Sequence, residues 1–111
     1  MPKVEEVERC YVGFATRDRA KVHFFDGSVL EPIEVRHGNG GFGYASQKSD
    51  TGLSILRDYL ERTESAIRAE ALAQAFTEQF LSELRENEVL FIEEFRIQDW
   101  LRVMRMFGQA A

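Results

Sequence analysis

Residues 37–52 read HGNGGFGYASQKSDTG and separate a strand-like half of the chain from a helix-like half. Five glycines give this stretch backbone freedom, and most of its other residues are small and polar. Ser49, Asp50 and Thr51 can each accept a hydrogen bond from an unpaired amide in the first turn of a helix, so one of them is expected to begin the next helix. The stretch therefore predicts a loop that presents a helix N-terminus, a place where a function is readily built.

Upstream of this stretch, hydrophobic residues alternate with other residues in two runs, at positions 10–15 and 20–25. An alternation with a period of two predicts strands. Asp26 and Gly27 separate the second run from a third, shorter one, and this pair favours a tight hairpin turn. Pro32 has no amide hydrogen to donate, so the residues around it are expected on an edge strand or in an extended lead into the loop.

Downstream of the stretch the hydrophobic period becomes helical. Leu53, Leu56 and Leu60 mark the first helix, and a second is expected from residues 63–65 to Asn87. Its buried seam consists of Leu72, Phe76, Phe80 and Leu84. A short apolar connector at residues 89–92, which could form one more strand, precedes a third helix over residues 93–107.

Together these elements predict one α+β domain over residues 1–111, with residues 1–9 weakly ordered. A small antiparallel β-meander of three or four strands is expected to pack against two or three C-terminal helices. The 111 residues are 44% hydrophobic and 30% charged, which suits a single globular core. The 19 acidic and 14 basic residues are interspersed and give a net charge of -5, so direct binding to nucleic acid is not expected.

The sequence offers little support for a catalytic or metal site. His23 and His37 are the only histidines, and neither lies at helical spacing from another ligand type, so no metal or other cofactor is expected. Cys10 is the only cysteine and is expected to be a small buried residue on a strand. A thiol in such a place is normally inert, so Cys10 is not expected to be a catalytic nucleophile. With a single cysteine and no apolar run long enough to span a membrane, we expect a cytoplasmic protein. Because no catalytic motif is found, we expect that it is not an enzyme.

The glycine-rich stretch allows two interpretations. A phosphate group could bind at the helix N-terminus, which would make the protein a small-molecule or nucleotide-phosphate binding module. The side chains available for this are those of Ser46, Lys48, Ser49 and Thr51. Neither GxGxxG nor GxxxxGK(S/T) is present, however. The other interpretation is a packed loop in which Phe42 and Tyr44 fill the core while Lys48 extends into solvent.

The last expected helix carries more hydrophobic surface than one packing seam needs. The residues that can all face the core are Ile97, Trp100, Leu101, Met104 and Phe107, whereas Val103 and Met106 point elsewhere on a helical wheel. All of them could belong to the domain's own core, between the sheet and the long helix. The excess favours instead a protein partner or a homodimer. The expected interface residues are Trp100, Val103, Met106 and Phe107.

The order of these features resembles an uncharacterised family of short bacterial proteins encoded by prophages or plasmids, known only as a domain of unknown function. Its members share a Tyr-x-Gly step, a Phe/Trp-Gly-Tyr glycine loop, a Leu-rich helix, a long helix and a final Ile-x-x-Trp-Leu helix. The corresponding residues here are 11–13 (YVG), 42–44 (FGY), 53–56 (LSIL), Phe76 with Phe80, and 97–101 (IQDWL). The family's Gly-Ser-Gly-Pro lead into the helix is replaced here by residues 46–49 (SQKS).

This resemblance spans residues 10–102 and implies an accessory protein of a mobile element. Combined with the small size and the lack of a catalytic motif, it leads us to expect a non-enzymatic protein-interaction factor. An inhibitor of host defence that occupies a partner's surface is one such factor. The phosphate-binding module remains the alternative.

Overall fold

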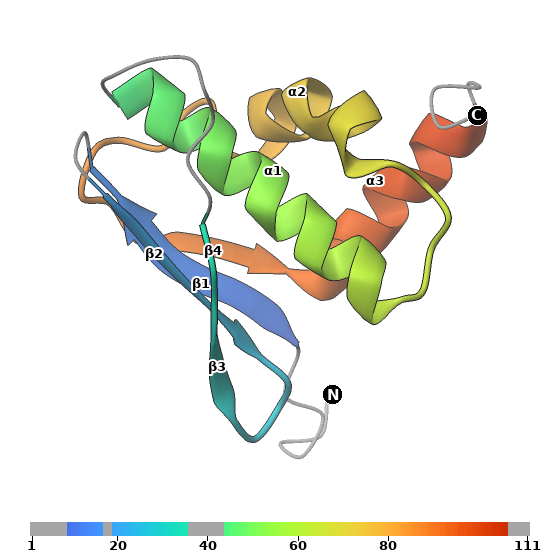
Figure 1. Cartoon of the computed structure of the whole chain (residues 1–111), viewed down its shortest axis with the longest axis horizontal. Coiled ribbons are helices and arrows are strands. Elements are labelled where there is room, and N and C mark those ends of the chain that lie inside the picture. The colour runs from blue at the N-terminus through green and yellow to red at the C-terminus, as the bar shows by residue number, and fades with distance from the viewer. Residues whose placement is uncertain (1–8, 17–18, 36–43, 107–111) are drawn as a thin grey trace, which may run out of the picture.

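The computed structural model describes residues 9–16, 19–35 and 44–106 (Figure 1). The described elements are, in chain order, β1 (Cys10–Ala15), β2 (Ala20–Phe25), β3 (Leu30–Ile33), α1 (Tyr44–Arg62), α2 (Ala69–Phe80), β4 (Leu90–Glu93) and α3 (Glu94–Met106). The strands form one antiparallel sheet in the order β3-β2-β1-β4. The expected α+β meander is therefore confirmed in its four-stranded form.

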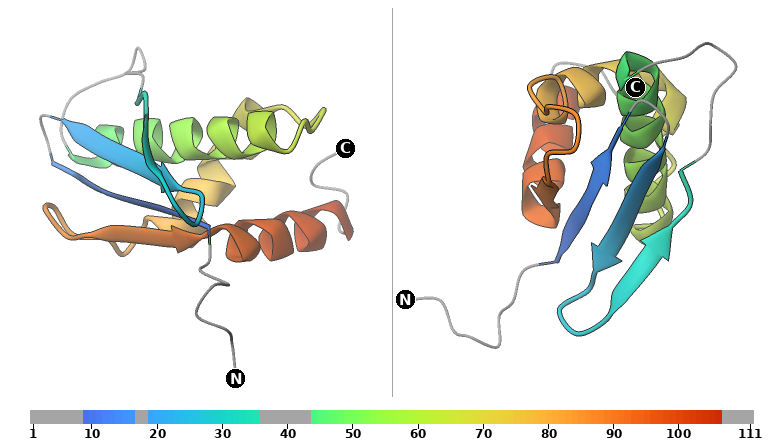
Figure 2. Two further views of the ribbon diagram at one scale, coloured as in Figure 1. Left: turned by 90° about the horizontal axis from the view of Figure 1, so that it is seen from below. Right: turned by 90° about the vertical axis from the view of Figure 1, so that its left-hand side faces the viewer.

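One face of the sheet is packed against the helices. Tyr11 of β1 lies between Phe24 of β2 and Ile92 of β4, and all three side chains are buried. Because side chains alternate along a strand, Val12 and Phe91 point to the opposite, outer face. Figure 2 shows α1 lying alongside the three meander strands.

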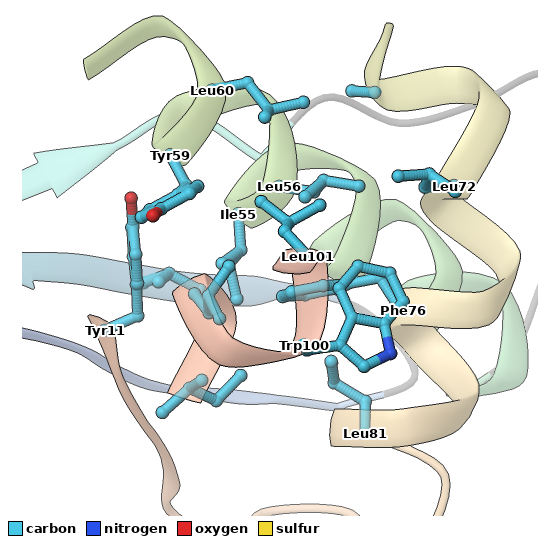
Figure 3. Close-up of a cluster of buried hydrophobic side chains, with 14 of the residues drawn as sticks. Tyr11, Ile55, Leu56, Tyr59, Leu60, Leu72, Phe76, Leu81, Trp100 and Leu101 are labelled. Carbon is cyan, nitrogen blue, oxygen red and sulfur yellow. The ribbon is translucent and has the colours of Figure 1, made fainter. Parts of the chain in front are cut away.

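The core lies between the inner face of the sheet and the three described helices (Figure 3). Helix α1 runs along the sheet and contributes Ile55, Leu56, Tyr59 and Leu60 to it. Phe76 of α2 is fully buried, as expected, and its ring contacts Trp100 of α3. Phe80 is only partly buried and packs against the edge of the core.

Helix α1 begins at Tyr44, so the prediction that it would begin at residues 49–51 was wrong. The residues after Tyr44 include Ala, Gln and Lys, which favour helix. Thr51, a predicted cap, instead lies buried inside the helix, and its Oγ1 donates to the Gln47 carbonyl at 2.6 Å. Phe42 and the side chain of Tyr44, expected to fill the core, lie outside the described part of the structure.

Helix α2 is shorter at both ends than the sequence predicted. Between α1 and α2 the chain turns through Glu64, whose φ is 52°, and the Ser65 N–H donates to the Leu60 carbonyl. This left-handed turn ends α1 and delays the start of α2 to Ala69. The helix stops at Phe80, and Leu84 is half-buried in the turns that follow it.

The strand predictions agree closely with the structure. The hairpin between β2 and β3 turns at Gly27, whose φ of 107° favours glycine. Asp26 Oδ1 accepts hydrogen bonds from the N–H groups of Ser28 and Val29, each at 2.9 Å. Pro32 lies on β3, an edge strand, as expected.

Candidate protein-binding site

Helix α3 divides the residues that were expected to contact a partner. Trp100 is buried within the domain, so its side chain belongs to the core and not to a partner surface. Val103 and Met106 are 46% and 77% exposed. Phe107 lies outside the described residues. The exposed part of the predicted interface is therefore Val103 and Met106.

Trp100 belongs to an aromatic cluster between α2 and α3. Its ring meets Phe76 and Phe80 edge-on, with centroids 5.5 and 5.9 Å away, and the two phenyl rings are 4.8 Å apart. On α3, the Arg96 guanidinium lies 5.5 Å from the centroid of the Phe80 ring. The Phe80 ring therefore contacts both the buried aromatic cluster and the exposed guanidinium of Arg96.

A cavity of about 760 Å³ opens between the C-terminal ends of α1 and α3. The buried side chains of Leu60 and Leu101 form part of its floor, and the exposed Arg102 and Arg105 line its rim. Met106 lies on the same rim. Met106 is therefore the exposed apolar residue of α3 that borders this cavity.

The residues proposed to bind an anion do not form one site. Lys48 Nζ donates to the Ser82 carbonyl at 3.1 Å, so the expectation that Lys48 extends freely into solvent was wrong. Because α1 begins at Tyr44, its unpaired amides precede Lys48, Ser49 and Thr51, and only Ser46 lies in the first turn. The helix N-terminus is therefore not presented where the phosphate hypothesis needs it.

Another group of exposed apolar residues lies at β4, the edge strand at the other side of the sheet from β3. Val89, Phe91 and Phe95 are exposed by 70%, 55% and 45%. Beside them, a groove of about 510 Å³ separates β4 from the end of α2. Its apolar lining consists of Phe80, Leu84, Val89, Leu90 and Phe91. This sheet edge thus combines exposed hydrophobic side chains with a concave surface.

The groove at β4 is also acidic. Its charged lining residues are Glu78, Glu83 and Glu88. Residues 78–94 contain six glutamates and one arginine, a net charge of -5 that equals the net charge of the whole chain. The rest of the protein is electrically balanced. The prediction that acidic and basic residues are interspersed therefore does not hold for residues 78–94, and three of the glutamates in this segment line the groove.

A polar network fastens α1 to the sheet. Tyr11 Oη donates to Asp58 Oδ2 at 2.8 Å, and Arg62 Nε donates to the same carboxylate oxygen at 2.5 Å. The Arg62 guanidinium lies 4.1 Å from the centroid of the Phe24 ring. Burial, reinforced by the Asp58 carboxylate, raises the pKa of Tyr11 far above its ordinary value. The phenol therefore stays protonated as a hydrogen-bond donor and stabilises the fold.

The residues considered for catalysis lie on the outer face of the sheet. Cys10 is buried, as expected, and its cross-strand neighbour is Phe25, whereas His23 lies opposite Val12. His37 lies outside the described residues. Within the described ranges, no group of three His, Cys, Asp or Glu residues could hold a metal ion.

No protein-family model, curated protein or solved structure matches this chain. None of the helices in the described part is long and apolar enough to cross a membrane. The functional assignment therefore depends on the surface of this protein itself.

Residues 89–92 were expected to form a connector or one more strand, and the structure shows the strand, but the groove beside it was not predicted. Two signals were present. Val89 and Phe91 alternate with Leu90 and Ile92, which places large apolar residues on both faces of one strand. The excess of glutamate over residues 78–94 was the second signal.

Proposed function

We propose that this protein is a non-enzymatic protein-interaction factor that binds a protein partner at the β4 edge. The observation that carries the proposal is the exposure of Val89, Phe91 and Phe95 beside a groove on one short segment. Exposed apolar side chains next to polar residues are typical of protein interaction sites. The phosphate-binding alternative has lost its geometric support, because Lys48 and Thr51 are engaged within the domain.

The resemblance to prophage- and plasmid-encoded proteins supports a role as a phage or mobile-element accessory. A small domain without a catalytic motif can act there by covering a surface of a host protein. Inhibition of host defence is one role of this kind. Binding at a sheet edge is sufficient for it, because occupancy alone excludes the host protein's other partners.

Self-association through α3 is a separate part of the proposal. Val103 and Met106 are exposed on α3, and Met106 borders the cavity next to α1. An isologous dimer is the commonest way for a small protein to bury such residues. A homodimer through α3 would leave the β4 edge free for the partner.

Affinity capture from a bacterial lysate tests the proposed function. The immobilised protein is compared with Phe91→Ser, which removes an exposed ring at β4, and with Val29→Ser. Val29 is 59% exposed on the β2–β3 hairpin and is the matched control. We expect Phe91→Ser to lose the captured protein and Val29→Ser to retain it, with equal thermal stability. Capture that neither substitution weakens would place the partner surface elsewhere.

A further inference from the structure

The outer edge of β4 carries main-chain groups that point away from the sheet. The Glu94 N–H donates to the Arg9 carbonyl at 2.8 Å, which identifies Arg9 and Glu94 as a hydrogen-bonded pair. Main-chain groups alternate in direction along an antiparallel strand. Since Ile92 lies opposite Tyr11, its main-chain groups face β1, whereas those of Phe91 and the N–H of Glu93 face outward. Among the described residues, no main-chain hydrogen bond closes this edge.

The edge at β3 differs from the edge at β4. The Asp26 N–H donates to the Val29 carbonyl, so by the same alternation Pro32 occupies an outward-facing position on β3. Proline has no N–H, and proline on an edge strand hinders the addition of another strand. The corresponding outward position on β4 holds Phe91 instead. Of the two edges, β4 is the one that can accept a further strand.

The surroundings of β4 suit the side chains of an added strand. Successive side chains of such a strand would point alternately to the two faces of the sheet. One set would enter the groove beside Phe80 and Leu84. The other set would lie on the outer face next to Phe91 and its neighbour Val12. Phe91 would be a direct cross-strand neighbour on the outer face, and Phe80 and Leu84 would offer apolar contacts in the groove.

The charge of the groove defines the chemistry of the partner. Glu78, Glu83 and Glu88 line it, and no basic side chain is among the described lining residues. The Glu88 carboxylate also accepts the main-chain N–H of Arg85 at 2.7 Å, which holds the carboxylate beside the groove. A second copy of this chain would place its own glutamates against these, so pairing of β4 with β4 is electrostatically unfavourable.

We propose that a basic, extended segment of the partner protein binds as a fifth strand along β4, with lysine or arginine alternating with apolar residues. Main-chain hydrogen bonds to Phe91 and Glu93 would provide affinity, and the glutamates of the groove would select a basic segment. This inference rests on the proposed function and specifies its partner chemistry. It differs from the α3 homodimer in both surface and occupant.

Three synthetic peptides of about ten residues test the proposal. The first alternates lysine with valine, the second replaces every lysine with glutamate, and the third repeats the first with every main-chain nitrogen methylated. Fluorescence anisotropy at low salt measures their affinities. We expect the second and third peptides to bind about tenfold more weakly, or worse, than the first. Amide chemical shifts should move mainly at Leu90–Glu93 and along the groove.

Two substitutions at one position separate the main chain from the side chain. Phe91→Ala and Phe91→Pro both remove the ring, but only Phe91→Pro removes the outward N–H. We expect Phe91→Pro to bind the lysine–valine peptide about tenfold more weakly than Phe91→Ala. If Phe91→Pro does not fold, the methylated peptide decides the question with the unmodified protein.

The possible outcomes are distinguishable. Equal binding of the methylated peptide, no binding of the lysine–valine peptide, or shifts confined to the helices would overturn strand addition. If lysate capture still depends on Phe91 in that case, the proposed function stands without this mode of binding. If capture does not depend on Phe91, the partner surface lies elsewhere and the proposed binding at the β4 edge fails as well. A dimer that Phe91→Pro disrupts would make a second copy the occupant and reject the basic segment.

Discussion

Gly52 lies within α1 at the point where α1 approaches α2. A Cβ at this position would lie 2.1 Å from Thr77 Oγ1 and 3.2 Å from Thr77 Cβ. Alanine is about 1 kcal/mol more favourable than glycine in a helix interior, so helix propensity alone predicts that Gly52→Ala stabilises the protein. The approach of α2 predicts the opposite sign.

The magnitude follows from which atoms can move. The Thr77 hydroxyl can rotate away from an added methyl group, but the Thr77 Cβ cannot, and 3.2 Å is shorter than an ordinary carbon contact of about 3.5–4.0 Å. The two helices must therefore move apart. Overpacking of this kind costs about 1–3 kcal/mol, which exceeds the gain in propensity. We expect Gly52→Ala to lower the free energy of unfolding by about 1 kcal/mol and Tm by about 4 °C.

Urea unfolding followed by circular dichroism measures this change. Thr77→Gly is the matched background, because it removes both side-chain atoms that the methyl group would meet. In that background Gly52→Ala should stabilise the protein by about 1 kcal/mol, so the coupling between the two positions should be about 2 kcal/mol. Equal stabilisation by Gly52→Ala in both backgrounds would refute the close packing of α1 on α2.

Three further substitutions test the core, the polar network and the dimer. Phe80→Ala should lower the free energy of unfolding by about 2–4 kcal/mol, since the partly buried ring contacts Trp100; a loss below about 1 kcal/mol in urea unfolding would contradict this packing. Tyr11→Phe should cost about 1.5–3 kcal/mol at neutral pH by breaking the bond to Asp58. Because the pKa of Tyr11 is raised by folding, its contribution is complete below about pH 10 and is lost as the pH rises further, so Tyr11→Phe should flatten the alkaline fall in stability. Met106→Glu should convert the proposed dimer to a folded monomer in light scattering, and an unsubstituted protein that is already monomeric would remove the dimer.

The sheet could be predicted because its signals are local. Alternation over residues 10–15 and 20–25 and the turn residues Asp26 and Gly27 depend on neighbours in sequence. The helix bounds depend on more distant contacts. The early start of α1 is accompanied by the burial of Thr51, and the late start of α2 follows a left-handed turn at Glu64. The hydrophobic periodicity of the sequence indicates neither of these features.

The candidate site was predicted only in part. The hydrophobic excess of α3 indicated exposed residues correctly at Val103 and Met106, but the burial of Trp100 needed Phe76 and Phe80, which are distant in sequence. Predicting the groove at β4 would have required knowing that β4 lies at the sheet edge. That position follows from pairing with β1, about 80 residues earlier in the chain, and long-range pairing leaves no local pattern.

The stretch that the sequence singled out still affects the candidate site, although it does not form it. Lys48, near the start of α1, donates to the carbonyl of Ser82, and Ser82 lines the groove beside β4. One helical turn later, Gly52 allows α2 to approach α1 at Thr77, just before the groove residue Glu78. Both contacts hold the C-terminal end of α2, which forms the wall opposite β4. The helix that follows the glycine-rich loop therefore supports the wall of the groove, whereas the residues proposed to recognise a partner lie within residues 78–94.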